Sequence, residues 1–239
     1  NGGSYFQGAS NLQVSATDPL DLTGTTNLSS AFSGASKFNG AIGNWDVSNV
    51  TNMASMFIGA AQFNQPLNDW GSKTSNVTDM SRMFTSAVRF NQPINTWDVS
   101  KVTTFLQMFN SANAFNSSVS GWVPSAATNM QYMFVNTASF NQPINWTQTG
   151  NVTTMLGMFQ NAPVFDQSLA SLNTSNVTDM SSMFQSATNF NGDVSTWDTS
   201  KVTTMAQMFY QASKLNNASG LSGWKTGNVT TMSRMFNYA

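Results

Sequence analysis

The feature that most constrains this sequence is a phenylalanine that returns at almost constant intervals along the whole chain. Its members are Phe6, Phe32, Phe57, Phe84, Phe109, Phe134, Phe159, Phe184, Phe209 and Phe236, spaced 25 to 27 residues apart. A period of this length is typical of repeat proteins, in which each small unit packs on the next. We therefore predict one repeat domain over residues 1–239, with a partial first unit at 1–23, full units from about 24, 49, 76, 101, 126, 151, 176 and 201, and a partial last unit at 228–239.

Around each of these phenylalanines, apolar residues recur at the spacing of a helix. Met80, Met83, Phe84, Ala87 and Phe90 follow the pattern i, i+3, i+4, i+7 and i+10. This is the stripe of an amphipathic helix of about three turns. A threonine precedes each stripe and is expected to cap the helix: Thr26, Thr51, Thr78, Thr103, Thr128, Thr153, Thr178, Thr203 and Thr230.

The second half of each unit indicates an extended segment. Pro93 blocks continuation of the helix, and the stretch from Ile94 through Trp97 to Val102 reads as a short strand. A helix and a strand in each unit of about 25 residues favour stacked right-handed coils with parallel strands. The predicted fold class is an α/β solenoid of about nine units of 25–27 residues, each with one short strand and one short helix.

Composition argues against most catalytic chemistry. Only 8% of the residues are charged, the formal net charge is −1, and the chain has no His, Cys or Glu. It therefore lacks an imidazole base, a thiolate and the usual zinc ligands. The acid pairs Asp193/Asp198 and Asp18/Asp21 are interpreted as solvated turn residues. We expect no enzyme activity and no catalytic, cofactor-binding or metal-binding residue.

The same composition limits partners and location. A chain without a basic surplus offers no footprint for nucleic acid. No apolar run approaches the roughly 18 residues of a membrane span. The absence of cysteine favours, weakly, an extracellular location.

Two polar or aromatic columns leave alternatives open. A tryptophan column, Trp45, Trp70, Trp97, Trp122 and Trp197, closes the core if it points inward, which we favour, or forms a ladder that stacks sugars if it points outward. The threonine column is interpreted as helix caps, with an ordered hydroxyl ladder of the ice-binding kind as the alternative. The methionine stripes are interpreted as core, although methionine can also bind soft metals.

Asparagine recurs both in a column after the second phenylalanine and in ten glycosylation sequons. The column is interpreted as a buried amide ladder that bonds turn backbone between units. Sequons of the form Asn-Val-Thr are interpreted mainly as structural. The remaining candidates for N-glycosylation are Asn27, Asn116, Asn145, Asn173 and Asn217.

The segments WDVSNVTNMASMF and SFNQPINW resemble the BspA-like leucine-rich-repeat surface proteins, a bacterial surface-protein repeat of about this length. The resemblance covers nearly the whole chain. It implies leucine-rich-repeat-like coils, exposure at the cell surface, a role in adhesion and no catalytic signature. Leu172 in place of Trp, and Ala126-Ala127 in place of Asn-Val, depart from the pattern.

Two classes of function follow from these observations. The first is a non-enzymatic extracellular scaffold, structural or adhesive, which belongs to a longer array or stacks end to end into a filament because both ends lie inside a unit. Its partners would be other copies, adjoining repeats, a host or matrix protein, or a surface glycan. The second is a carbohydrate- or ice-binding module that uses the Trp or Thr column.

Overall fold

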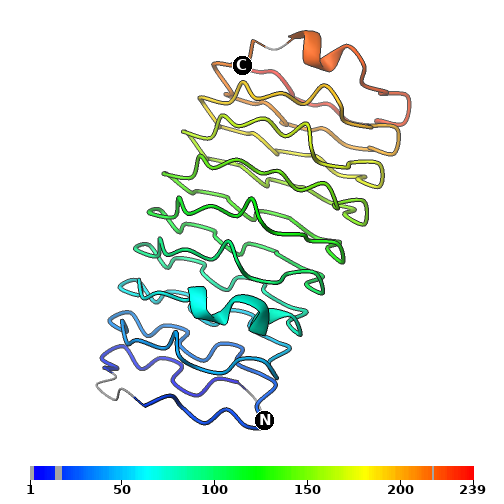
Figure 1. Ribbon diagram of the computed structural model, residues 1–239. Helices are drawn as coiled ribbons and strands as arrows, with labels where there is room; N and C mark the ends of the chain where they lie inside the picture. Colours follow the sequence, from blue (N-terminus) through cyan, green and yellow to red (C-terminus); the bar gives the residue numbers. More distant parts are fainter. Residues whose placement is uncertain (1–2, 14–17, 217) are drawn as a thin grey trace.

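The computed structural model describes residues 3–13, 18–216 and 218–239 and shows a stack of similar coils. The N-terminus lies at one end of the stack and the C-terminus at the other (Figure 1). One residue of each coil forms a parallel β-bridge with the equivalent residue of the next coil. The bridged residues are Asn27, Asn52, Asp79, Thr104, Asn129, Thr154, Asp179, Thr204 and Thr231.

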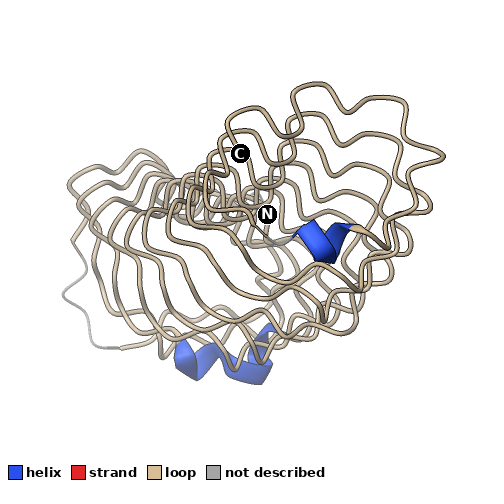
Figure 2. Ribbon diagram, turned by 90° about the horizontal axis from the view of Figure 1, so that it is seen from above, coloured by secondary structure: helices blue, strands red, loops and turns tan. Residues whose placement is uncertain are grey.

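Regular secondary structure is nearly absent from these coils. Within the described residues the helices are two short 3₁₀ segments, η1 at Asn68–Thr74 and η2 at Ala218–Leu221, and β-pairing consists of the isolated bridges (Figure 2). The prediction of an α/β solenoid built from one helix and one strand per unit is therefore wrong. What takes the place of the helix is a series of tight turns.

This series, which we call the turn run, spans residues 53–63 in one coil and the equivalent positions in the others. Its backbone N–H groups alternate between two kinds of acceptor. The N–H of Met56 bonds to the carbonyl of Met53 three residues earlier, at 3.2 Å, whereas the N–H of Phe57 bonds to Met83 of the next coil, at 2.8 Å. Half of the donors therefore close turns and the other half join the coils.

Left-handed backbone conformations make this alternation possible. From Ser30 onward, each turn run has two residues four positions apart with positive φ, such as Ser55 at 58° and Gly59 at 70°, or Arg82 at 56° and Ser86 at 58°. An α-helix of L-residues excludes that conformation, and it is typical of the third residue of a type II turn. The helical pattern of apolar residues arises because turns that repeat every four residues also place positions 1, 4, 5 and 8 on one side.

The expected strand is also misplaced. In one coil the Trp-containing segment forms η1, and the bridged residue of each coil falls after the threonine, at Asn52 or Asp79 for example. Nor does the threonine cap a helix. Instead, the side chain of the following residue caps the turn run, because Oδ1 of Asp79 accepts the N–H of Ser81 at 2.8 Å. This is an Asx turn, a local side-chain cap that needs no helix.

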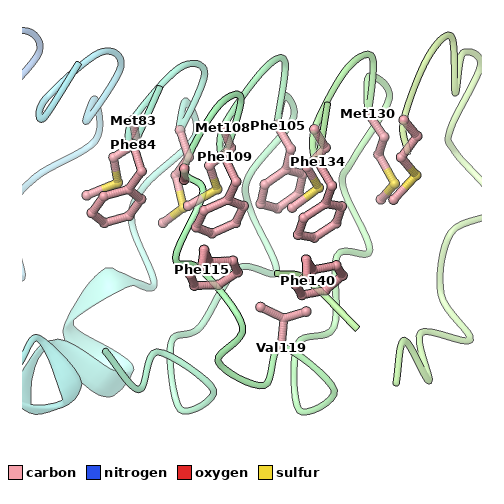
Figure 3. Close-up of a cluster of buried hydrophobic side chains, with 14 of the residues drawn as sticks. Met83, Phe84, Phe105, Met108, Phe109, Phe115, Val119, Met130, Phe134 and Phe140 are labelled. Carbon is pink, nitrogen blue, oxygen red and sulfur yellow. The ribbon is translucent and has the colours of Figure 1, made fainter. Parts of the chain in front are cut away.

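The apolar columns form one continuous core along the stack. Met83, Phe84 and Phe90 have no exposed surface, and the ring centroids of Phe84 and Phe90 lie 3.9 Å apart within one coil. Phe84 also stacks on Phe109 of the next coil, with a centroid distance of 5.7 Å and an interplanar angle of 3°. Figure 3 shows methionine side chains packed beside these rings. Each coil is therefore closed by its neighbours, as repeat proteins require.

In the part of the chain that the structure describes, no helix is long and apolar enough to cross a membrane.

Candidate functional site

The tryptophan column lies inside the core. Trp45, Trp70, Trp97, Trp122 and Trp197 are each at most 6% exposed, as is Trp146. The indole N–H groups reach carbonyls of the preceding coil: Trp122 Nε1 donates to Ile94 O at 2.9 Å, and Trp97 Nε1 to Leu67 O at 3.0 Å. No indole face of these six is open for stacking on a sugar, so we do not propose an aromatic carbohydrate site.

One coil replaces this tryptophan with Leu172, and the structure shows what takes over its hydrogen bond. The hydroxyl of Ser171, next to it in the chain, donates to Ile144 O at 2.9 Å. This carbonyl is the equivalent of those that accept an indole N–H in the other coils. A buried carbonyl left without a donor costs free energy, and the neighbouring serine avoids that cost.

The asparagine column forms a hydrogen-bonded ladder. Oδ1 of Asn64 accepts the backbone N–H of Asn91 at 3.0 Å, and Oδ1 of Asn91 accepts that of Asn116 at 2.8 Å. Asp166 takes the place of an asparagine and serves in the same way, because it accepts the N–H of Asn191 at 2.7 Å. Several of these side chains are exposed or half-buried, so the ladder lies nearer the surface than the sequence predicts.

The threonine column, by contrast, is exposed on the side of the stack. From Thr51 to Thr230, each hydroxyl of the column donates to the carbonyl of the threonine one coil earlier, at 3.0 to 3.2 Å. The same carbonyl also accepts the backbone N–H of that threonine; Thr128 N, for example, lies 2.9 Å from Thr103 O. The side chains therefore have fixed rotamers and point to solvent in a single file.

A second row runs beside the threonines, two positions earlier in each coil. Its members are Asn49, Asn76, Lys101, Ala126, Asn151, Asn176, Lys201 and Asn228. The residue between the two rows is a valine or alanine that packs against the core, and its N–H closes a turn, as that of Val77 does on Thr74 O at 2.9 Å. We call the two rows together the Asn–Thr face.

The amides of the Asn–Thr face are held in the same manner as its hydroxyls. Nδ2 of Asn76 donates to Ser48 O at 2.9 Å, and Nδ2 of Asn151 to Ser125 O at 2.8 Å. This leaves Oδ1 as the atom that can accept a donor. At Asn76 a donor is present, because Lys101 Nζ lies 2.9 Å from Oδ1.

The aspartates serve as caps of surface turns. Hydrogen bonds from Ser100, first from its hydroxyl and then from its N–H, lower the pKa of Asp98 from its usual 3.8, and Ser200 lowers that of Asp198 in the same way, backbone N–H first. Hydrogen bonds from the N–H and then the hydroxyl of Ser195 lower the pKa of Asp193. Asp193 Oδ1 accepts the N–H of Ser195 at 2.9 Å and Asp198 Oδ1 accepts that of Ser200 at 3.0 Å, so each carboxylate of this pair caps its own turn. In the described residues no group of three or more acids lies close enough to hold a metal ion.

The five candidate sequons differ in how their asparagines are held. Asn27 caps a turn through Ser29 N at 2.8 Å, and Asn173 does so through Ser175 N at 3.1 Å. Asn116 belongs to the asparagine ladder, where it accepts the N–H of Asn141 at 2.9 Å. Asn145 is exposed, and its side chain makes no hydrogen bond within the described residues. Asn217 lies outside the described residues.

These features define a class of protein: a repeat protein of stacked coils joined by aromatic columns and side-chain ladders. The chain belongs to the family described as Mycoplasma protein of unknown function, DUF285, whose profile matches residues 3–73, 72–169 and 144–239. Among curated proteins no match to the chain is found.

This membership corrects the resemblance to BspA-like leucine-rich-repeat proteins. The family that matches is a different one, and no leucine-rich-repeat family matches. The physical reason for the error is that the shared apolar spacing does not identify the backbone conformation. Here the spacing is produced by turns with positive φ and not by a helix.

Proposed function

We propose that this protein is a non-enzymatic structural repeat protein, a scaffold that acts outside the cell at its surface. The observation that carries the proposal is the unbroken coupling between coils. Bridges join every coil from Asn27 to Thr231, and the aromatic stack runs beside them from Phe6 to Phe236. A rigid body of uniform cross-section is suited to hold or space other groups.

The geometry of the coils also supports addition of further coils. Each turn run donates N–H groups to the coil that follows and accepts from the coil that precedes, so the pattern itself sets no limit to the number of coils. We propose on this ground that the scaffold acts as part of a longer array of such coils or as a filament of stacked copies.

Surface location can be tested by labelling intact cells that produce the protein. A membrane-impermeant amine reagent should modify exposed lysines such as Lys101 and Lys201 before the cells are broken. A cytosolic protein of the same cells serves as the control and should be labelled after lysis only. If this chain follows the control, the surface location is wrong.

Electron microscopy of the purified chain tests the scaffold itself. The eight bridged steps predict a rod of roughly 38 Å, at about 4.8 Å per step. Single particles of uniform length and curvature support the proposal, and so do longer fibres at high concentration. Flexible particles of variable length would contradict it.

A further inference from the structure

The Asn–Thr face is a regular array in which each threonine hydroxyl from Thr51 to Thr230 makes the same hydrogen bond. Its threonine hydroxyls donate inward to the preceding coil, so each Oγ1 can still accept a hydrogen bond from outside, with a methyl group beside it. Its asparagines donate inward through Nδ2, which leaves Oδ1 as the acceptor. The face therefore presents a continuous row of fixed threonine acceptors beside an interrupted row of asparagine acceptors. Lys101, Ala126 and Lys201 interrupt the second row, and the two lysines already donate to Oδ1 of Asn76 and Asn176.

The regularity of the rows restricts the kind of partner. The threonine row has one member in every coil, and the residues inserted in the longer units fall elsewhere, as η1 does at Asn68–Thr74. A partner that binds all the members must repeat at the step of the coils, about 4.8 Å. Because the rotamers are already fixed, little side-chain entropy is lost when such a partner binds.

The chemistry of the face restricts the partner further. Thr51 to Thr230 carry no charge, and the neighbouring row has Lys101 and Lys201 as its charged members. The rows contain no aromatic ring for a sugar to stack on and no basic stripe for a phosphate backbone. What the face can take is a lattice of small hydrogen-bond donors that also accommodates methyl groups.

We propose that the Asn–Thr face binds ordered water, and that the protein adsorbs to ice through it. Water molecules donate to Oγ1 and Oδ1 along both rows. The ammonium of Lys101 on Asn76, and that of Lys201 on Asn176 at 2.5 Å, occupy positions that donors from the lattice would take in the other coils.

Thermal hysteresis and inhibition of ice recrystallisation, measured on the whole chain, test this assignment. Thr128→Tyr and Thr153→Tyr place a large ring in the middle of the threonine row and should lower both activities several-fold. Thr188→Tyr is the matched control. Thr188 is also exposed, and its hydroxyl donates to Pro163 O of the preceding coil at 3.3 Å, but it lies off the face. This variant should keep the activity of the parent chain.

A second variant is designed to raise the activity, because a variant that merely fails to fold cannot gain activity. Lys101→Asn combined with Lys201→Asn leaves Ala126 as the one member of the row that is not asparagine, frees Oδ1 of Asn76 and Asn176, and should raise recrystallisation inhibition. A folded parent chain without activity on ice would overturn the proposal, and so would equal losses in Thr128→Tyr and Thr188→Tyr. Binding to insoluble cellulose or chitin that Thr128→Tyr abolishes, without activity on ice, would replace ordered water by a polysaccharide.

Discussion

At the scale of single residues, the structure is held by partners that come from the neighbouring coil. Within the described residues, every buried side-chain nitrogen or oxygen has a hydrogen bond. The indole N–H of Trp122 and the hydroxyl of Ser171 are equivalent, because each donates a hydrogen bond to a carbonyl one coil earlier. Different side chains can therefore serve the same position when they present the same donor.

This equivalence predicts the effect of removing either donor. Ser171→Ala takes from Ile144 O the one donor that the structure gives it, and should lower the free energy of unfolding by about 1–3 kcal/mol, the usual cost of a buried group that loses its partner. Trp122→Phe keeps a ring in the core, and Ile94 O keeps the backbone N–H of Trp97 at 3.2 Å, so this variant should cost only about 0.5–1.5 kcal/mol, the usual net value of one hydrogen bond. Urea denaturation measures it. As a control, Ser139→Ala changes an exposed serine for which the structure gives no side-chain hydrogen bond within the described residues, and should have little effect.

Acid should destabilise the protein in a narrow range of pH. Asp98 has a lowered pKa in the folded chain, so its ionised form stabilises the fold. That contribution is complete above the unfolded value of 3.8 and is lost as the pH falls through the folded value. Since the chain has no histidine, the melting temperature should be flat near neutral pH and fall below about pH 4. Asp98→Asn should flatten part of that fall; an identical curve would contradict this account.

At the scale of the element, the turn run depends on residues that tolerate positive φ. Gly157 shows this dependence best. It has a φ of 58°, and a Cβ built on it would lie 2.4 Å from two ring carbons of Tyr132 in the preceding coil. Gly59 has a φ of 70°, but its Cβ would meet nothing closer than 3.8 Å. The two glycines separate the cost of the backbone from the cost of the contact.

We therefore expect Gly157→Ala to destabilise the protein more than Gly59→Ala does. The backbone term is about 1–2 kcal/mol in both, and the clash adds to it at Gly157 alone. In a Tyr132→Ala background, Gly157→Ala should cost no more than Gly59→Ala. Thermal denaturation of the four variants completes the double-mutant cycle. Equal costs at Gly157 and Gly59 in the parent chain would show that Tyr132 moves aside.

The apolar columns could be predicted from sequence, whereas the backbone that carries them could not. Met80, Met83, Phe84 and Ala87 are buried on one side whether the local period is 3.6 residues or four. Periodicity alone cannot tell a helix from a run of tight turns. The signal that separates them is a column of glycine, serine and asparagine four residues before the second phenylalanine of each unit. Its first members are Gly34, Gly59, Ser86, Ser111, Asn136 and Asn161, of which Gly34 and Gly59 most clearly tolerate positive φ.

The threonine row was interpreted wrongly for the same reason, because a helix was expected where the structure has the turn run. With a helix expected after Thr51, a capping role was the natural interpretation of its hydroxyl. With turns in place of the helix, the acceptor becomes Thr26 O of the preceding coil, and the side chain lies outside. The donor–acceptor pair spans 25 residues, so no local pattern could reveal it.

At the scale of the whole molecule, contacts are made between adjacent coils. The ladder bonds, the bridges and the stacks along each aromatic column, such as Phe84 on Phe109, join one coil to the next. Stability is then close to a sum over coils and the interfaces between them. A coil should therefore be removable as a block, provided that the register of the columns is kept.

Deletion of residues 101–125 tests this. It places Ala126 after Ser100 and brings Trp146 to the carbonyl of Ile94, in place of Trp122. The shortened chain should fold, melt cooperatively and give a rod that is shorter by one step. The matched control removes residues 101–112 and breaks the register of every column that follows. If the two deletions melt alike, the coils are not independent units.

The bonds between coils run along the length of the stack, and this has a mechanical consequence. A force applied between the two ends loads these bonds in series, so they open one coil at a time. Each coil that opens replaces a step of about 4.8 Å by a chain segment of roughly 80 Å, given about 3.3 Å for each of some 25 residues. Under tension the molecule therefore lengthens stepwise many times over and dissipates work at each step. Anchored at one end, it would yield to a pull and recoil when released.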